Sequence, residues 1–290
     1  MYSKLALGTA QFGLNYGITN DVGQVKTKEV RKILSFAKQN NINSIDTAIE
    51  YGDCELSLGK ANVLDWRVIT KLPVIPKNTN NIAVWINQQI QASLLLLKIP
   101  KLEGLLLHKP CELLGKNGKE IWKIIQTKKD EGLIKKIGFS IYNPDELEPL
   151  LASYKPDIVQ APYNILDRRI KSSGWLQKLN ENNIEVQARS IFLQGLLLMS
   201  PIKRNKLFYK WRFLWRDLES WLVKNNISAL EASLGFAMSE RNFDYVIVGV
   251  ETQKQLEEII RISKSNCDLD FPESLSTSDV NLIEPVNWIC

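Results

Sequence analysis

Short apolar runs alternate with longer amphipathic stretches along nearly the whole chain. The apolar runs predict strands at Leu5–Thr9, Asn43–Thr47, Trp66–Lys71, Leu102–His108, Ile134–Ser140, Asp157–Gln160, Ile184–Ala188 and Tyr245–Gly249. The intervening stretches predict helices near residues 27–40, 53–61, 79–97, 117–131, 144–153, 172–182, 213–240 (long enough for two helices) and 252–264. Runs such as LEGLLL are apolar throughout, which is typical of strands that helices cover on both faces.

Eight strand–helix units in 290 residues, with no internal repeat or linker, favour a single-domain (β/α)8 TIM barrel, an α/β fold. A doubly wound sheet that bound a dinucleotide would be expected to carry a glycine-rich turn after its first strand, and the sequence has no GxGxxG motif. We assign residues 1–264 to the barrel and residues 265–290 to a polar C-terminal tail that packs on it. This tail contains Pro272 and Pro285, ends in Trp288 and Ile289, and shows no catalytic motif.

Charge and composition narrow the range of partners. The net charge of +5 comes without a dense lysine or arginine block, so we expect no nucleic-acid partner. The apolar runs are far shorter than the ~20 residues of a membrane span, and the N-terminal segment does not resemble a secretion signal. The four cysteines are scattered without CxxC spacing, which favours a reducing, cytoplasmic location. The single histidine, His108, excludes multi-histidine zinc sites, and we predict no metal site.

Four proton-handling side chains lie at the ends of neighbouring predicted strands. Asp46 ends the second strand, Tyr51 lies in the loop that follows it, Lys71 ends the third strand, and His108 ends the fourth. Because catalytic groups of a barrel gather at the carboxyl ends of its strands, we expect these four to converge. Each residue alone is more simply interpreted as structural, but the combination favours catalysis.

The expected roles follow from ordinary pKa values. A free phenol with a pKa near ~10 is a poor acid at neutral pH, so we expect the Lys71 ammonium to lower the pKa of Tyr51. Asp46 would hold Lys71 charged and oriented, and His108 would hydrogen-bond the substrate oxygen. Such a site protonates a developing alkoxide, which suits carbonyl reduction by an external hydride donor.

The sequence resembles the aldo/keto reductase family over nearly its whole length. The motifs are LGTAQFG (7–13), IDTAIEYGDCELSLG (45–59), VITK (68–71), LLLH (105–108), IGFS (137–140), VQAPYNILDRR (159–169) and VIVGVETQKQLEE (246–258). The resemblance implies a (β/α)8 barrel that binds NADPH in an extended form without a Rossmann fold. It also implies that Asp46, Tyr51, Lys71 and His108 are the catalytic tetrad.

The resemblance also implies a set of cofactor-binding residues. They are Gly8, Thr9, Asp46, Ser140, Gln160, Arg189, Ser190, Gly249, Thr252 and Gln255. Ser140 and Gln160 match positions that bind the nicotinamide carboxamide. Ile141 replaces the asparagine that usually follows this serine, and Asn143 is a candidate substitute. Arg189 stands where the family commonly stacks a tyrosine under the nicotinamide ring, and its planar guanidinium would face a ring that is cationic when oxidised.

The last strand–helix junction bears on the choice of cofactor. A helix N-terminus after Gly249, with Thr252 as its N-cap, would offer N–H groups to a phosphate. Many family members carry basic residues at the positions of Gly249 and Gln255, where they bind the 2′-phosphate of NADPH. Both positions are uncharged here. We therefore expect NADP(H), with NAD(H) as the alternative.

We predict an NAD(P)H-dependent reduction of an aldehyde or ketone to an alcohol, with sugar-derived carbonyl compounds among the candidate substrates. The first alternative is a regulatory subunit that binds the cofactor without turnover, and a more distant one is a barrel hydrolase or lyase that uses His108. The basic, aromatic stretch Lys203–Arg216 either covers the cofactor or an anionic substrate, or packs as an amphipathic helix on the barrel. We favour packing.

Overall fold

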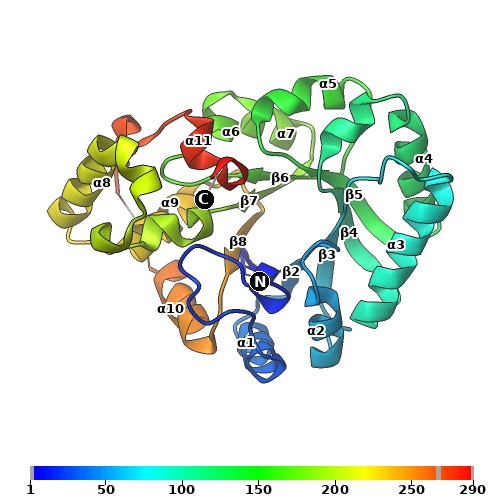
Figure 1. Ribbon diagram of the computed structural model, residues 1–290, viewed down its shortest axis with the longest axis horizontal. Helices are drawn as coiled ribbons and strands as arrows, with labels where there is room; N and C mark the ends of the chain where they lie inside the picture. The colour runs from blue at the N-terminus through cyan, green and yellow to red at the C-terminus, as the bar shows by residue number, and fades with distance from the viewer. Residues whose placement is uncertain (1–2, 266–268, 289–290) are drawn as a thin grey trace.

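Eight parallel strands close into a barrel in the computed structural model, which describes residues 3–265 and 269–288 (Figure 1). The strands are β1 (Leu5–Gly8), β2 (Ser44–Asp46), β3 (Arg67–Leu72), β4 (Leu102–Leu107), β5 (Ile134–Ser140), β6 (Ile158–Pro162), β7 (Glu185–Arg189) and β8 (Tyr245–Gly249). They are hydrogen-bonded in sequence order, and β8 returns to β1 with Gly8 opposite Gly249. The predicted single-domain (β/α)8 fold is confirmed.

The helices surround this barrel (Figure 1). They are α1 (Thr27–Gln39), α2 (Cys54–Ala61), α3 (Ile82–Leu97), α4 (Gly118–Asp130), α5 (Leu147–Leu151), α6 (Arg169–Ser172), α7 (Trp175–Glu181), α8 (Arg212–Lys224), α9 (Ala229–Ser239), α10 (Gln253–Ser263) and α11 (Val280–Ile283). The long predicted span 213–240 is two helices, α8 and α9. Helix α9 begins with a capping box in which Ser228 and Glu231 bond each other's backbone, and α3 begins at the Asn81 cap.

The barrel interior changes from apolar to polar along the strands. Ile69, Leu106 and Ile158 form a small apolar cluster inside the barrel, separate from the main core. Because side chains alternate along a strand, the residues two positions further on also point inward. Those residues are Lys71, His108 and Gln160. The alternation of side chains along each strand thus places polar groups inside the barrel at its carboxyl end.

The C-terminal tail lies against the barrel through polar contacts. Arg168 donates to the carbonyl oxygens of Phe271 and Pro272 at 3.0 and 2.9 Å. Arg169 pairs with Glu284 at 2.9 Å. Leu282 and Ile283 of α11, the helix coloured red in Figure 1, are buried in the main apolar core. Ile289 lies outside the described residues.

Candidate active site

Asp46 and Lys71 form a buried ion pair at the carboxyl end of the barrel. The Lys71 ammonium lies 2.6 Å from Asp46 Oδ1 and also donates to the Thr47 carbonyl oxygen at 2.9 Å. Lys71 is 1% exposed and Asp46 is 6% exposed. Burial lowers the pKa of Lys71, and the Asp46 carboxylate opposes this shift. The Asp46–Lys71 pair therefore contributes little net charge to the site.

Tyr51 is placed beside this pair by a tight contact between two loops. A Cβ atom at Gly13, after β1, would lie 1.8 Å from the Tyr51 carbonyl oxygen, so only glycine allows the loops to approach. Lys71 Nζ lies 5.2 Å from the centroid of the Tyr51 ring, and the ring meets His108 edge-on at 6.0 Å. The three side chains thus lie within contact range, as predicted.

The pKa of Tyr51 shifts in the opposite direction to the expected one. Burial raises the pKa of the Tyr51 phenol, the Asp46 carboxylate raises it further, and the Arg189 guanidinium opposes the rise. Lys71 does not produce the predicted lowering, because its charge is balanced by Asp46 at 2.6 Å. The phenol therefore keeps its proton at neutral pH, which is the form that a proton donor needs.

His108 directly follows β4 and is neutral at physiological pH. Burial lowers its pKa to about 3, with further lowering from the positive charges of Lys71, Arg189 and Lys109. The Glu50 carboxylate lies 2.7 Å from Nδ1, but Nδ1 has no hydrogen-bond partner of suitable geometry among the described residues. Since the Glu50 side chain is 49% exposed, water screens its charge. A neutral imidazole can donate or accept a hydrogen bond to a ligand.

Hydrogen-bonded amide side chains hold the Asp46 carboxylate in place. Gln160 Nε2 donates to Asp46 Oδ1 at 2.7 Å and lies 3.3 Å from Gln187 Oε1. Ser140 donates to Gln160 Oε1 at 3.4 Å, and Gln187 donates to Glu185 at 2.7 Å. Ser140 and Gln160, predicted to bind a carboxamide, therefore bond to each other and to the ion pair in this structure.

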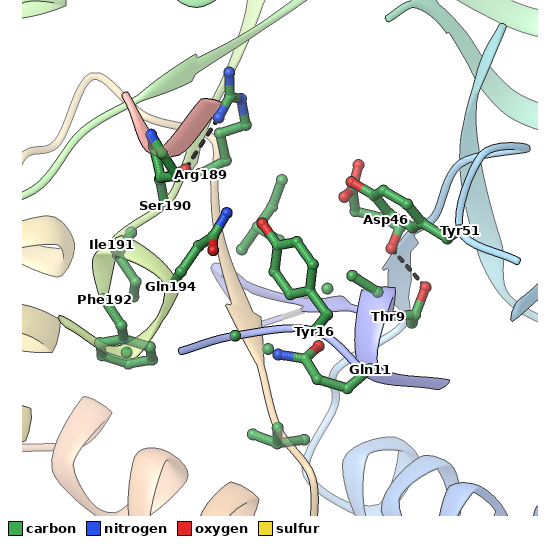
Figure 2. A pocket seen from close by; sticks show the side chains of 18 of the residues that line it. Thr9, Gln11, Tyr16, Asp46, Tyr51, Arg189, Ser190, Ile191, Phe192 and Gln194 are labelled. Atoms are coloured by element: carbon green, nitrogen blue, oxygen red, sulfur yellow. Dashed lines mark hydrogen bonds between the residues drawn. The ribbon is translucent and has the colours of Figure 1, made fainter. Parts of the chain in front are cut away.

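Arg189 occupies the end of β7, on the side of the barrel opposite β3. Its guanidinium donates to the Ile141 carbonyl oxygen at 2.8 Å and to Ser190 Oγ at 3.0 Å. The guanidinium carbon lies 4.5 Å from the centroid of the Tyr142 ring, whereas Nε is buried without a partner among the described residues. Figure 2 shows Arg189 across the cavity from Asp46 and Tyr51.

A cavity of about 690 Å³ joins these groups to the β8–α10 junction. All four predicted tetrad residues line it. So do the predicted cofactor residues Gly8, Thr9, Asp46, Ser140, Gln160, Arg189, Ser190, Gly249 and Gln255. Thr252, also predicted to bind the cofactor, is not among the lining residues; its side chain caps α10 by accepting a hydrogen bond from the Gln255 backbone at 3.2 Å. The size falls within the ~300–1,000 Å³ range of small-molecule and cofactor sites.

The N-terminus of α10 is already capped. Gln255 Oε1 accepts hydrogen bonds from the backbones of Glu251 and Thr252 at 2.7 and 3.2 Å. Glu29, from α1, accepts the backbone N–H of Gln253 at 2.9 Å. Among the described residues, the ionisable side chains that line this end of the cavity are Glu251 and Glu258, and no lysine or arginine does so. A phosphate here would meet acidic side chains and few free N–H groups.

Several cavity residues escaped the sequence analysis because they come from loops or the tail. Tyr16 and Gln11 follow β1, Gln194 follows β7, and Pro285 and Val286 come from the tail. Burial raises the pKa of Tyr16 to about 12, and a hydrogen bond with Gln194 opposes the rise. In Figure 2 the Tyr16 ring lies between Gln194 and the Asp46–Tyr51 side. In the sequence, Tyr16 was marked only by the glycine that follows it. In the structure Gly17 has a φ of 104°, a conformation that favours glycine.

Other predicted features lie away from this cavity. None of residues 203–216 lines it; Phe208 and Trp215 are buried in the core instead, which agrees with the packing interpretation. In the described part of the chain, no helix combines the length and apolar character needed to cross a membrane. Cys54 and Cys111 are free, and Cys267 and Cys290 lie outside the described residues.

The fold and the site together define a class of protein: a (β/α)8 barrel with an Asp–Lys pair, a tyrosine and a histidine at its carboxyl end. The chain matches the model of the aldo/keto reductase family over residues 4–275. It belongs to this family.

Individual relatives agree with this assignment. The chain is 33% identical over 189 residues to YtbE of Bacillus subtilis (strain 168), described as an uncharacterized oxidoreductase, and the match spans 62% of this chain and 65% of that protein. Two solved structures share the fold. An aldo-keto reductase from Bacillus halodurans, AKR11C1 in holo form, has a TM-score of 0.72 at 19% identity, covering 91% of this chain and 88% of that one. A putative aldo-keto reductase from Pseudomonas aeruginosa has a TM-score of 0.67 at 20% identity, covering 90% of both chains. Family membership supports an oxidoreductase role.

Proposed function

We propose that the chain reduces an aldehyde or ketone to an alcohol, with a nicotinamide dinucleotide as the hydride donor. The observation that carries this proposal is the convergence of Asp46, Tyr51, Lys71 and His108 at one end of a 690 Å³ cavity. The opposite end of the cavity, at the β8–α10 junction, leaves room for the remainder of a dinucleotide. Sugar-derived carbonyl compounds are among the candidate substrates.

Tyr51 is the proton donor in this proposal. When bound, a reduced nicotinamide supplies the hydride that the carbonyl carbon accepts. Tyr51 keeps its proton at neutral pH because burial raises its pKa, and it gives this proton to the carbonyl oxygen as negative charge develops there. The Arg189 guanidinium stabilises the phenolate, which then regains a proton from solvent. Neutral His108 donates a hydrogen bond that orients the same oxygen.

The cavity residues indicate where such a cofactor would lie. Hydride transfer requires the nicotinamide near Tyr51 and His108, so Ser140, Gln160 and Arg189 would surround it. The adenosine would then lie toward Gly249 and Gln255.

The family resemblance implies NADP(H), but the acidic β8–α10 end offers no cation to a 2′-phosphate, and a carboxylate suits the ribose hydroxyl of NAD(H). We therefore propose that NADH competes effectively with NADPH in this chain.

A binding and turnover assay tests the proposal. Because none of the eight tryptophans lines the cavity, calorimetric titration with NADPH and NADH is more direct than tryptophan quenching. The cofactor that binds is then mixed with a panel of aldehydes and ketones, sugars included, and loss of reduced nicotinamide is followed together with the alcohol formed. Failure of both cofactors to bind would overturn the proposal.

A second candidate function, a cofactor-binding subunit without turnover, is favoured by one observation. Ser140 and Gln160 direct their polar groups to each other and to Asp46 rather than to the open cavity. Tight cofactor binding with no turnover of any carbonyl compound in the same assay would support this alternative.

A further inference from the structure

Arg189 is the cation of the cavity whose charge is not balanced nearby. Lys71, His108 and Arg189 are the basic side chains that line the cavity. Lys71 is paired with Asp46 at 2.6 Å, and the pKa of His108 near 3 leaves it neutral. Among residues 3–265 and 269–288, no carboxylate forms an ion pair with Arg189. The wall of the cavity at β7 therefore carries a net positive charge.

This charge is held in a fixed place. Hydrogen bonds to the Ile141 carbonyl and to Ser190, together with the Tyr142 ring, restrain the guanidinium on three sides. Its partners are neutral, so they orient the charge without cancelling it. The buried, unpartnered Nε shows that the donor set is incomplete within the protein itself.

A bound nicotinamide ring would lie between this cation and the proton donor. Arg189 ends β7, and Lys71 lies on β3 at the opposite side of the closed barrel. A hydride donor must approach a carbonyl carbon whose oxygen contacts Tyr51. The other face of the ring would then be turned toward the β7 wall, because Arg189 lies across the cavity from Tyr51 (Figure 2).

We propose that Arg189 makes this cavity discriminate between the redox states of the nicotinamide, binding the neutral reduced ring more tightly than the cationic oxidised ring. This inference rests on the proposed function. The two rings have nearly the same shape but differ by one unit of charge, so a fixed cation opposes only the oxidised form. A unit charge ~4 Å away changes an affinity about fivefold in bulk water and about a thousandfold at an effective dielectric constant of ~20. In a cavity that opens to solvent we expect a value toward the lower end of this range, about tenfold.

Three carboxylates besides Asp46 also line the cavity. The Glu50 carboxylate stands on the opposite rim and attracts an oxidised ring, but its exposed side chain is screened by water. Glu251 and Glu258 lie at the other end of the cavity. The consequence for function is that the oxidised cofactor would leave readily after each turnover and inhibit carbonyl reduction only weakly.

The test is the ratio of the dissociation constants for oxidised and reduced cofactor, measured by calorimetry. Wild type is compared with Arg189→Met and Arg189→Gln, which remove the charge, and with Arg189→Lys, which keeps it. Arg212→Met, which changes an exposed arginine outside the cavity, is the matched control. ADP-ribose, which lacks nicotinamide, reports whether each variant keeps the rest of the site.

We expect wild type, Arg189→Lys and Arg212→Met to favour the reduced form, and the two neutral variants to lower the ratio about tenfold with ADP-ribose binding unchanged. An unchanged ratio in both neutral variants, or an equal loss in Arg189→Lys, would overturn the inference while leaving the proposed function intact. Absence of binding of either redox form to wild type would instead overturn the proposed function.

Discussion

At the scale of single residues, the site depends on which charges are balanced and which are not. The sequence located Asp46, Tyr51, Lys71 and His108 because each follows or ends an apolar run. It could not show how deeply the Tyr51 phenol is buried, and burial is the main reason that its pKa rises. The pairing of Asp46 with Lys71 was expected from the sequence, but not its consequence: at 2.6 Å, Asp46 balances the Lys71 charge, so Lys71 does not lower the pKa of Tyr51.

His108 links the protonation of the site to the stability of the fold. Its pKa is about 3 in the folded protein and ~6.5 when unfolded, so between these values only the unfolded state holds the proton. This residue is therefore expected to make stability fall as pH decreases from about 6.5 toward 3, by at most ~1.4 kcal/mol per pH unit.

The isosteric variant His108→Gln measures this contribution. Urea unfolding of wild type and variant at several pH values should show a steeper loss of stability for wild type on the acid side. Parallel loss in both proteins would contradict the assignment and indicate that Glu50, 2.7 Å from Nδ1, pairs with a charged imidazole.

At the scale of secondary-structure elements, α10 illustrates a contact that local sequence patterns cannot reveal. The capping box between Thr252 and Gln255 is readable from the sequence, and the N-cap was predicted correctly. The Gln253 N–H also donates a hydrogen bond to Glu29. This bond joins residues 224 positions apart, so no local sequence pattern predicts it. For that reason the sequence analysis overestimated the N–H groups that this helix offers to a phosphate.

The acidic lining at α10 leads to a prediction about cofactor preference. Glu258→Lys places a cation at the cavity end where the adenosine would lie, and Glu257→Lys makes the same charge change next to it, outside the cavity lining. Glu258→Lys should raise the affinity for NADPH relative to NADH by about two- to fivefold, in the range of an exposed ion pair. Glu257→Lys should change that ratio much less. Equal effects of the two variants would show that the 2′-phosphate lies elsewhere.

Helices α2 and α3 meet at Gly59, the last residue of the motif around Tyr51. A Cβ atom here would lie 1.9 Å from the Leu96 carbonyl oxygen, so Gly59→Ala should force the helices apart and cost ~1–3 kcal/mol of unfolding free energy. At Gly115 the nearest atom to an added Cβ is 3.3 Å away, which makes Gly115→Ala the milder control. Thermal unfolding of both variants tests the contact, and equal midpoints would contradict it.

At the scale of the whole molecule, the barrel was predictable because its signal repeats. Each of the eight units contains an apolar run and an amphipathic helix, and hydrogen bonds between neighbouring strands join the eight strands into a closed barrel. The part of the cavity wall that the β1 loop, the β7 loop and the tail form was not predictable, because apolar residues do not recur periodically in these segments. The backbone of Ile18 donates to the Gln194 carbonyl at 3.1 Å, which joins the β1 and β7 loops, while Pro285 and Val286 come from the tail.

We propose that this barrel reduces carbonyl compounds with Tyr51 as the proton donor. The most direct test compares wild type with Tyr51→Phe, which removes only the phenolic oxygen, in carbonyl-dependent oxidation of the cofactor that binds. We predict a loss of kcat of at least ~100-fold, as expected for a general acid, with the dissociation constant for the reduced cofactor nearly unchanged. A variant that binds the cofactor and reduces the carbonyl compound at the wild-type rate would contradict the account.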